Sequence, residues 1–539
     1  MEKRKYKLEK KSPCKKLKTN LTLLLALIIS TTGCHYKIEK NTYDKIPPKV
    51  INTIMEMDNK DELIEEIVSQ IKEQVETEIK NKKQEQELNI VTESLLDLDT
   101  ANNQLQQYGR FNVAGMKTTD YAKAMKQEWQ PVISEGQIQD LSIDLKRAYT
   151  YQELEVFMKN LAKYEGVNLT IIGKTVEGRN IYSLSINMKP YLKKETVLLT
   201  GQIHAREFAG SIFILKQYEE LIKKAQTDPY TKLLLENVRF EAVPIINPDG
   251  REAIINGANV RKKSNINGVD LNHNFPAVNA FQISNGVKPE KNISSTPGLD
   301  FFPGYNLGSE PETQALMKWL HTYIPETKYY MDYHQQGRVI YAVKPWDVKN
   351  NEQHDHNFTN TISAHINNNS NTKYRYEPNT PTYGFNGSGG TVTDYATSIS
   401  MGFKFSKKYG RMVLNVDGQE LPLLIFKDLD YYPLQYKPVN NKFATLTLEI
   451  GRGLEALGYD NKARQLMAQE YTRNNYNTLL SYTAELAIGA QKVNELKEQI
   501  KTQKNNNTIT YLNNIKKTLL ANNEVNKSNN NEKIYALQR

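Results

Sequence analysis

One stretch of the chain constrains its fold more than any other: an apolar run that leads through His-x-x-Glu directly into a helical pattern. The run from Val197 to Ile203 has the length and composition of a buried strand, and from Glu207 onward the apolar residues recur with helical periodicity. The end of the strand therefore presents His204 and Glu207 together. Such a pair can hold two corners of a tetrahedral zinc site, which needs a third ligand from elsewhere and an open position for water.

Strands and helices alternate from about Arg147 to Ala490. Further strands are predicted within 168–186, 240–250, 328–336 and 444–451, and helices at 149–166 and 311–324. This alternation predicts an α/β fold whose mixed sheet is covered by helices on both faces. Ligands of such sheets collect at the C-terminal ends of the strands. His204 and His334 lie at such ends and Glu449 lies near one, which makes all three candidates for the site.

The N-terminus carries a targeting signal. Residues 1–20 are strongly basic, and the apolar segment LTLLLALIIS that follows is too short for a comfortable membrane span. The sequence Thr-Thr-Gly-Cys then resembles a bacterial lipoprotein cleavage site. We predict that residues 1–33 are a signal peptide, that Cys34 is lipidated, and that the protein is anchored outside the cell. An uncleaved N-terminal anchor, with Cys34 incidental, is the alternative.

Charge and cysteine content exclude two classes of function. Residues 1–33 hold nine Lys/Arg and two Glu, so they account for +7 of the formal net charge of +9. The remainder is nearly neutral, which gives no reason to expect a nucleic-acid partner. Cys14 and Cys34 are the two cysteines of the chain. After cleavage the protein can form no internal disulfide, and its folded domain can use neither a Cys nucleophile nor a Cys-ligated metal.

The segments on either side of the α/β region are polar. Residues 34–146 are predicted to be a linker and a helical stalk or pro-like segment. Leu63, Ile67, Ile71, Val75 and Ile79 recur at a spacing of four and form one apolar stripe, which suits a stalk or a simple packing helix equally. Residues 491–539 are rich in Asn and Lys and contain no Gly or Pro, which predicts a polar tail that is helical or partly disordered.

Several short motifs, taken in their order along the chain, give the α/β region a specific resemblance. TVEGRNIYSLSI, GQIHAREF, INPDGRE, VRKKSNINGVDLNHNFP, PETQAL, MDYHQQ and TLTLEIG resemble successive motifs of the zinc carboxypeptidase family. The resemblance covers roughly residues 147–490. It implies a catalytic domain with a mixed, eight-stranded-type sheet, one Zn²⁺ per chain and a peptide substrate.

The resemblance also implies a role for each matching residue. His204, Glu207 and His334 would bind Zn²⁺, and Glu449 would act as the general base toward a zinc-activated water. Arg261 would stabilise the oxyanion. Asn272 would hold the substrate's terminal carboxylate, and Arg206 would reach a neighbouring subsite. Taken singly, each residue also has an ordinary structural reading: Glu207 at a helix N-terminus, Glu449 on a solvent-facing strand position, and Arg261 in a solvated basic turn.

The chain departs from the family pattern where the substrate would bind. The family's exopeptidases usually have Asn-Arg-Asn, whereas this chain has His273 in place of the Arg, and a His cannot form the two-pronged grip of a guanidinium on a carboxylate. Tyr383 is the candidate for the family's mobile Tyr, with Tyr395 as the alternative. Val392 is the candidate specificity residue and favours an uncharged side chain. The aromatic segment 398–441 is predicted to be an inserted lid or rim.

Three functions remain open at this stage. The first is an extracellular zinc metallocarboxypeptidase that acts at or near peptide C-termini. The second is a cell-wall peptidase that cuts a γ-D-glutamyl–diaminopimelate bond in peptidoglycan stem peptides. The third is a catalytically silent, peptide-binding lipoprotein, which the replacement of Arg by His273 motivates. The membrane is an expected partner in each case, through the lipid anchor.

Overall fold

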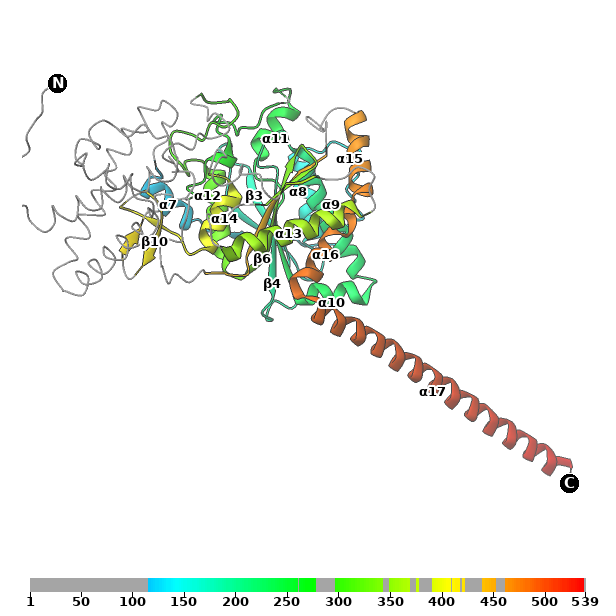
Figure 1. Cartoon of the computed structure of the whole chain (residues 1–539). Helices are drawn as coiled ribbons and strands as arrows, with labels where there is room; N and C mark the ends of the chain where they lie inside the picture. Colours follow the sequence, from blue (N-terminus) through cyan, green and yellow to red (C-terminus); the bar gives the residue numbers. More distant parts are fainter. Residues whose placement is uncertain are drawn as a thin grey trace, which may run out of the picture. The chain divides into compact units, whose positions relative to one another are not determined.

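The computed structural model describes residues 115–537, except 260, 278–295, 343–348, 369–374, 378–389, 409, 417–418, 422–438 and 452–460. The predicted signal peptide, the lipidation residue Cys34, most of the predicted stalk and the candidate Tyr383 lie outside these residues. Figure 1 shows the described part as a sheet with helices packed along it.

The sheet is mixed, as the sequence predicts. Within the described residues it has nine strands, in the order β1-β2-β3-β5-β4-β6-β12-β7-β8. The strands are β1 Gln130–Pro131, β2 Val167–Lys174, β3 Asn180–Ile186, β4 Glu195–Gly201, β5 Val238–Val243, β6 Thr327–Gln335, β7 Val339–Ala342, β8 Arg375–Glu377 and β12 Ala444–Ile450. The four adjacent strands β5, β4, β6 and β12 are parallel to one another. Their C-terminal ends therefore meet at one edge of the sheet.

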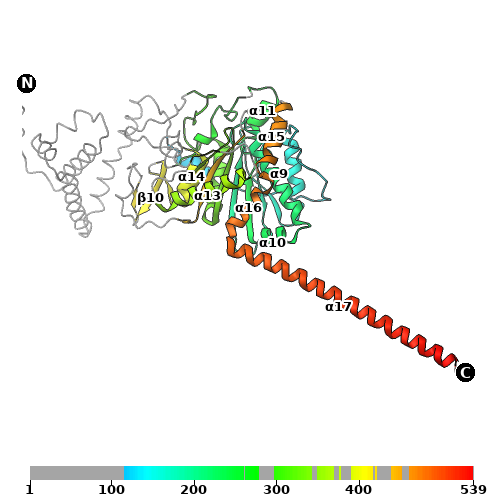
Figure 2. The same cartoon turned by 45° about the vertical axis from the view of Figure 1, so that its right-hand side comes forward.

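Helices cover both faces of this sheet, because alternate side chains of its strands point to opposite sides. On one face, Val197, Leu199 and Met331 join a core with α8 (Tyr151–Leu161), α9 (Phe208–Ala225), α10 (Pro229–Asn237), α13 (Lys349–Asn367), α15 (Asn461–Arg473) and α16 (Tyr476–Ile488). On the other face, Leu198 and Tyr330 pack with α7 (Thr118–Met125), α12 (Pro311–Tyr323) and α14 (Val392–Ser400). Figures 1 and 2 show α9 beside α16 and away from α14.

The start of α9 packs very closely against β6. A Cβ atom added to Gly210 would lie 2.6 Å from the carbonyl oxygen of Tyr333, so only glycine allows this approach. The contact brings the first turn of α9 next to the C-terminal end of β6. It therefore places Glu207, which immediately precedes α9, beside His334 at the end of β6.

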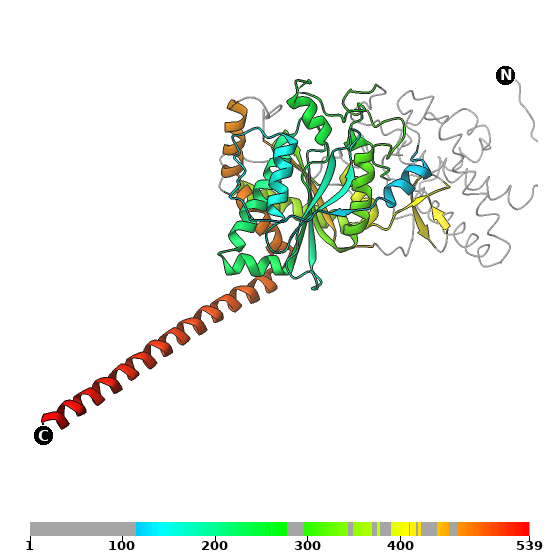
Figure 3. The same cartoon turned by 180° about the vertical axis from the view of Figure 1, so that it is seen from behind.

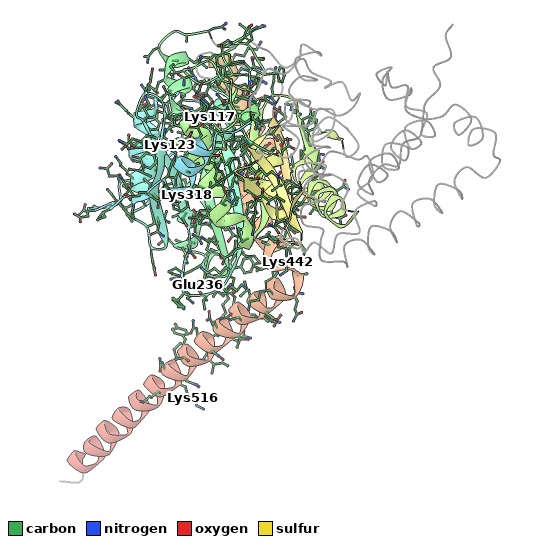
Figure 4. The ribbon with its side chains drawn as sticks, turned by 90° about the vertical axis from the view of Figure 1, so that its left-hand side faces the viewer. Lys117, Lys123, Glu236, Lys318, Lys442 and Lys516 are labelled. Carbon is green, nitrogen blue, oxygen red and sulfur yellow. The ribbon has the colours of Figure 1, made fainter. Side chains whose placement is uncertain are left out.

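The compact unit begins earlier than the predicted boundary at Arg147. Met116 and Ala124 are buried on the α12 side, and Ile143 is buried in the opposite core. Lys318 of α12 lies 5.5 Å from the ring centroid of Trp129. Figure 4 shows Lys318 on the same side of the protein as Lys117 and Lys123 of the α7 region. Residues 115–146 are thus part of the packed α/β unit.

The remaining elements lie outside the main sheet. Helix α11 (Pro248–Ile255) follows β5, and a separate antiparallel sheet holds β9 (Lys404–Ser406), β10 (Arg411–Val416) and β11 (Gln419–Leu421) within the predicted insertion. The predicted tail forms a single helix, α17 (Ala490–Leu537), which Figure 3 shows as one continuous element. Val493 and Leu496 are buried, and residues 501–517 are exposed.

No helix in the described residues has both the length and the apolar character needed to cross a membrane.

Candidate metal centre

The three predicted metal ligands meet at one point. His204 Nδ1 lies 2.7 Å from Glu207 Oε1, His334 Nδ1 lies 2.9 Å from Glu207 Oε2, and the two Nδ1 atoms are 3.2 Å apart. All three side chains are buried. The structure thus brings together residues that are 127–130 positions apart in the chain, as the sequence predicts.

Local structure fixes each ligand. His204 lies in the turn after β4, Glu207 is the last residue before α9, and His334 lies near the end of β6. Glu207 does not cap its helix with a side-chain hydrogen bond. Its Oε2 instead accepts the backbone N–H of Gln335 at 3.2 Å. The ordinary structural reading of Glu207, as a residue that simply favours a helix N-terminus, therefore does not account for its position.

The second ring nitrogen of each imidazole, Nε2, lies near a buried carboxylate. His204 Nε2 lies 3.2 Å from Asp270 Oδ1, and His334 Nε2 lies 2.6 Å from Asp332 Oδ2. Histidine ligands of metals usually donate their second N–H to such a group, which leaves the other ring nitrogen free to bind. Neither aspartate was predicted from the sequence. Asp332 was detectable in principle, because residues two apart in a strand share a face; Asp270 has no comparable local signal.

The electrostatics of the cluster fit a bound cation. Burial alone would lower the pKa of His334, but Asp332 and Glu207 raise it well above its usual range. Burial would raise the pKa of Glu207, yet His204 and His334 hold it far below. The Nδ1 atoms of His204 and His334 are 3.2 Å apart, and both face the Glu207 carboxylate. A proton or a metal ion shared by these atoms would relieve the repulsion between their lone pairs. Two neutral imidazoles and one carboxylate are a donor set that suits zinc.

Glu449 lies directly beside the ligands. In the parallel pairing of β12 with β6, Glu449 is opposite His334. Burial raises its pKa to about 7, His334 lowers it, and Glu207 raises it further. A carboxyl group with a pKa near neutrality exchanges protons readily at physiological pH, which is the property of a general base. The alternative reading of Glu449 as an ordinary solvent-facing carboxylate does not fit this environment.

Asn272 and His273 lie on the short 3-10 helix η1 (Leu271–His273), next to the ligands. Asn272 Nδ2 is 3.4 Å from His334 Nε2, and Asn272 Oδ1 accepts the backbone N–H of Val392 at 3.0 Å. His273 Nε2 lies 3.9 Å from Asp270 Oδ2, and its ring is 5.3 Å from that of Phe301. These two of the predicted substrate-binding residues are therefore at the edge of the centre.

The structure describes two cations of the RKK sequence near the centre, the predicted Arg261 and its neighbour Lys263. Arg261 is exposed, and its carbonyl oxygen accepts a hydrogen bond from Arg206 Nη1 at 2.8 Å. The carbonyl of Lys263 accepts the N–H of Ala205, the residue after His204, at 2.9 Å. Burial has the larger effect on the pKa values of Glu449, Asp270 and His204, but the Lys263 ammonium lowers all three. The role predicted for Arg261 thus stays a prediction, and Lys263 is a second candidate for the cation of this site.

The specificity candidates have different outcomes. Tyr395, the alternative to Tyr383, is fully buried, and its hydroxyl lies 2.9 Å from His321 Nε2, so it is a core residue. Val392 is also fully buried, in the core on the α12 side. Its backbone, through the bond to Asn272, is what contacts the site. The proposed side-chain role of Val392 in specificity gains no support from this position.

A buried His-Glu-His cluster at the C-terminal edge of parallel strands, with a glutamate of raised pKa beside it, defines a metallohydrolase-type centre. Residues 154–420 match the family model described as zinc carboxypeptidase. This part of the chain is a zinc carboxypeptidase domain. The region matched includes all three metal ligands and ends before Glu449.

Named relatives agree with this assignment over part of their length. The chain is 29% identical to mouse (Mus musculus) carboxypeptidase M over 214 residues, which is 37% of this chain and 41% of that protein. It is 29% identical to the human carboxypeptidase N catalytic chain over 185 residues, 33% of this chain and 39% of that protein. The chain thus spans about two fifths of the length of these relatives.

Two solved structures also resemble the chain. Carboxypeptidase A from Helicoverpa armigera has 19% identity and a TM-score of 0.46, and the match covers 65% of this chain and 76% of that one. The murein-tripeptide amidase MpaA from Escherichia coli O157 has 15% identity and a TM-score of 0.29, with 56% and 91% covered.

Proposed function

We propose that this protein is a zinc-dependent metallocarboxypeptidase that hydrolyses peptide bonds at or near peptide C-termini. The observation that supports this most directly is the placement of Glu449 beside His334 in the sheet, next to the buried cluster that His334 forms with His204 and Glu207. Hydrolysis needs a metal ion that activates water and a group that accepts the proton of that water, and this arrangement provides a place for each.

His204, Glu207 and His334 would hold the zinc ion. When bound, zinc lowers the pKa of a coordinated water and polarises the substrate carbonyl. The carboxylate of Glu449 accepts a proton as water attacks the carbonyl carbon, and it returns a proton to the amine nitrogen as the C–N bond breaks. Arg261, as the family resemblance implies, or its neighbour Lys263 would supply the fixed positive charge that stabilises the carbonyl oxygen as negative charge develops there.

Recognition of the substrate's end is proposed for Asn272 and His273, which share the η1 segment at the edge of the centre. An imidazole donates one hydrogen bond to a carboxylate where an arginine donates two in parallel. This substitution favours weaker or pH-dependent binding of a terminal carboxylate. It is also compatible with a substrate that ends in a different group. A peptidoglycan stem peptide is therefore the second substrate candidate.

Paired peptides test the proposed end specificity. With full-length, zinc-loaded protein, we expect loss of single C-terminal residues from peptides with free carboxylates and no cleavage of amidated copies, as read by mass spectrometry. Cleavage of both sets would show that the terminal carboxylate is not recognised. Cleavage of neither set, with release of diaminopimelate from a stem peptide carrying a γ-D-glutamyl bond, would transfer the proposal to the cell-wall substrate.

The pH dependence of the reaction should follow Glu449. Because the base must be ionised, activity should fall as the pH drops through its pKa. That pKa is about 7 in the absence of metal, and a bound cation stabilises the ionised form and lowers it. We therefore expect the acid limb of the kcat/KM profile to lie below pH 7. An acid limb with its midpoint above about pH 7.5 would contradict this assignment.

The location of the activity is proposed from the sequence alone. The basic leader, the short apolar segment and the cleavage-like sequence before Cys34 support lipid anchoring at the outer face of a bacterial membrane. In that setting the substrates would be extracellular peptides or stem peptides of the cell wall.

A further inference from the structure

We propose that Asp332 is a positioning residue for the metal centre: it fixes the tautomer and the ring orientation of His334 so that Nδ1 is held ready to bind the ion. This inference rests on the proposed function, because it concerns the same centre. It assigns a role to a buried carboxylate that neither holds the metal nor takes part in proton transfer.

Strand geometry places Asp332 and His334 on the same side of the sheet. Tyr330, Asp332 and His334 alternate along β6, and Tyr330 belongs to the core on the α12 face. In the parallel pairing of β4 with β6, Asp332 is opposite Thr200. The backbone of two central strands therefore determines where the carboxylate lies, and little side-chain freedom is left.

Hydrogen bonds then use both oxygens of Asp332. Its Oδ2 lies 2.6 Å from His334 Nε2, and its Oδ1 accepts the hydroxyl of Thr200 at 2.6 Å. The Thr200 hydroxyl, having given its single proton to Asp332, accepts from the hydroxyl of Tyr330 at 2.7 Å. Asp332, Thr200 and Tyr330 are all fully buried.

The direction of this chain of hydrogen bonds decides the state of the imidazole. The Asp332 carboxylate oxygen at 2.6 Å is an acceptor, so the hydrogen of this contact belongs to Nε2 of His334. In the neutral ring, Nδ1 then holds the lone pair, and Nδ1 is the atom that faces Glu207 at 2.9 Å and His204 at 3.2 Å. Without Asp332 the ring would be free to protonate at the other nitrogen or to rotate, and each bound ion would have to reorder it.

The affinity of the full-length protein for zinc tests this role directly. Outer partners of metal-bound histidines typically contribute about 10–100-fold in metal affinity. In a chelator competition assay we expect Asp332→Asn to weaken zinc binding by about that factor. We expect the visible spectrum of the cobalt-substituted protein to change as well. Thr200→Val, which leaves Asp332 in place but removes its second hydrogen bond, should cause a smaller loss in the same direction.

Asp249→Asn is the matched control. Asp249 is equally buried but accepts hydrogen bonds from Thr175 Oγ1 at 2.8 Å and Glu177 N at 2.8 Å, outside the metal centre. This variant should lose thermal stability without any change in zinc affinity. Zinc affinity unchanged within twofold in both Asp332→Asn and Thr200→Val, in a wild type that binds zinc and cleaves peptides, would overturn the inference alone. A wild type that binds no zinc would overturn the proposed function and this inference together.

If Asp332→Asn does not fold, Thr200→Val decides the question. Its hydroxyl touches no metal ligand, so a purely structural role would lower the melting temperature and leave both the zinc affinity and the cobalt spectrum as in the wild type.

Discussion

Replacing Glu449 with Gln should lower kcat/KM for a cleaved peptide by about 10²–10⁴-fold, the usual contribution of a positioned acid–base group. Gln keeps the size of the side chain but cannot take a proton from water. The loss should appear mainly in kcat, because Glu449 is needed for the chemical step and is not one of the three ligands of the buried cluster. Zinc content measured on the same preparation should equal that of the wild type.

The comparison also decides between an enzyme and a silent binding protein. If the wild type holds zinc but is no more active than Glu449→Gln on any peptide or stem peptide, the enzyme proposal fails. The peptide-binding alternative would then remain, with its zinc serving only to anchor a ligand. Loss of zinc in Glu449→Gln would instead mean that Glu449 supports the metal, and its role as the base would need a different test.

Replacing Lys263 with Met should lower kcat/KM by about 10²–10³-fold, as expected for the loss of one preorganised group that stabilises an oxyanion. Met retains most of the length of the side chain and removes only the charge. Lys263 is half-buried, and its charge acts on Glu449, Asp270 and His204 together. Because an ammonium in this position stabilises charge that develops during the reaction, the effect should lie in kcat more than in KM.

Arg261→Met is the natural control, since both residues belong to the same basic loop. Arg261 is exposed, and its backbone carbonyl is bonded to Arg206. Its replacement should change kcat/KM by less than about threefold, and Lys263→Arg should recover part of the lost activity. A large loss in Arg261→Met with little effect in Lys263→Met would instead support the assignment of Arg261 made from the sequence.

The sequence predicted the features that depend on local pattern. The strand before His204, the helix after Glu207 and the strand that ends near His334 each follow from periodicity, and the shared edge of parallel strands then brings the ligands together. The mixed sheet was predicted correctly on the same grounds. It has nine strands in the described residues, where the family resemblance implies an eight-stranded type.

What the sequence did not predict depends on contacts between distant segments. Arg261 and Lys263 are equivalent as cations in a basic loop, and the sequence alone does not show that Lys263 is half-buried while Arg261 is exposed. Burial of Met116 and Ile143 against the two cores moved the start of the packed unit before Arg147. Tyr395 was the alternative to Tyr383 for the family's mobile Tyr, but its helix turns that side chain into the core.

The position of β12 in the sheet has a consequence for biosynthesis. This strand is the last of the sheet in sequence, yet it is inserted between β6 and β7 and carries Glu449 beside His334. A nascent chain that has not yet reached Ala444 therefore has a gap in the middle of its sheet and has no base. We therefore expect no hydrolytic activity from nascent chains or truncated fragments that end before Ala444.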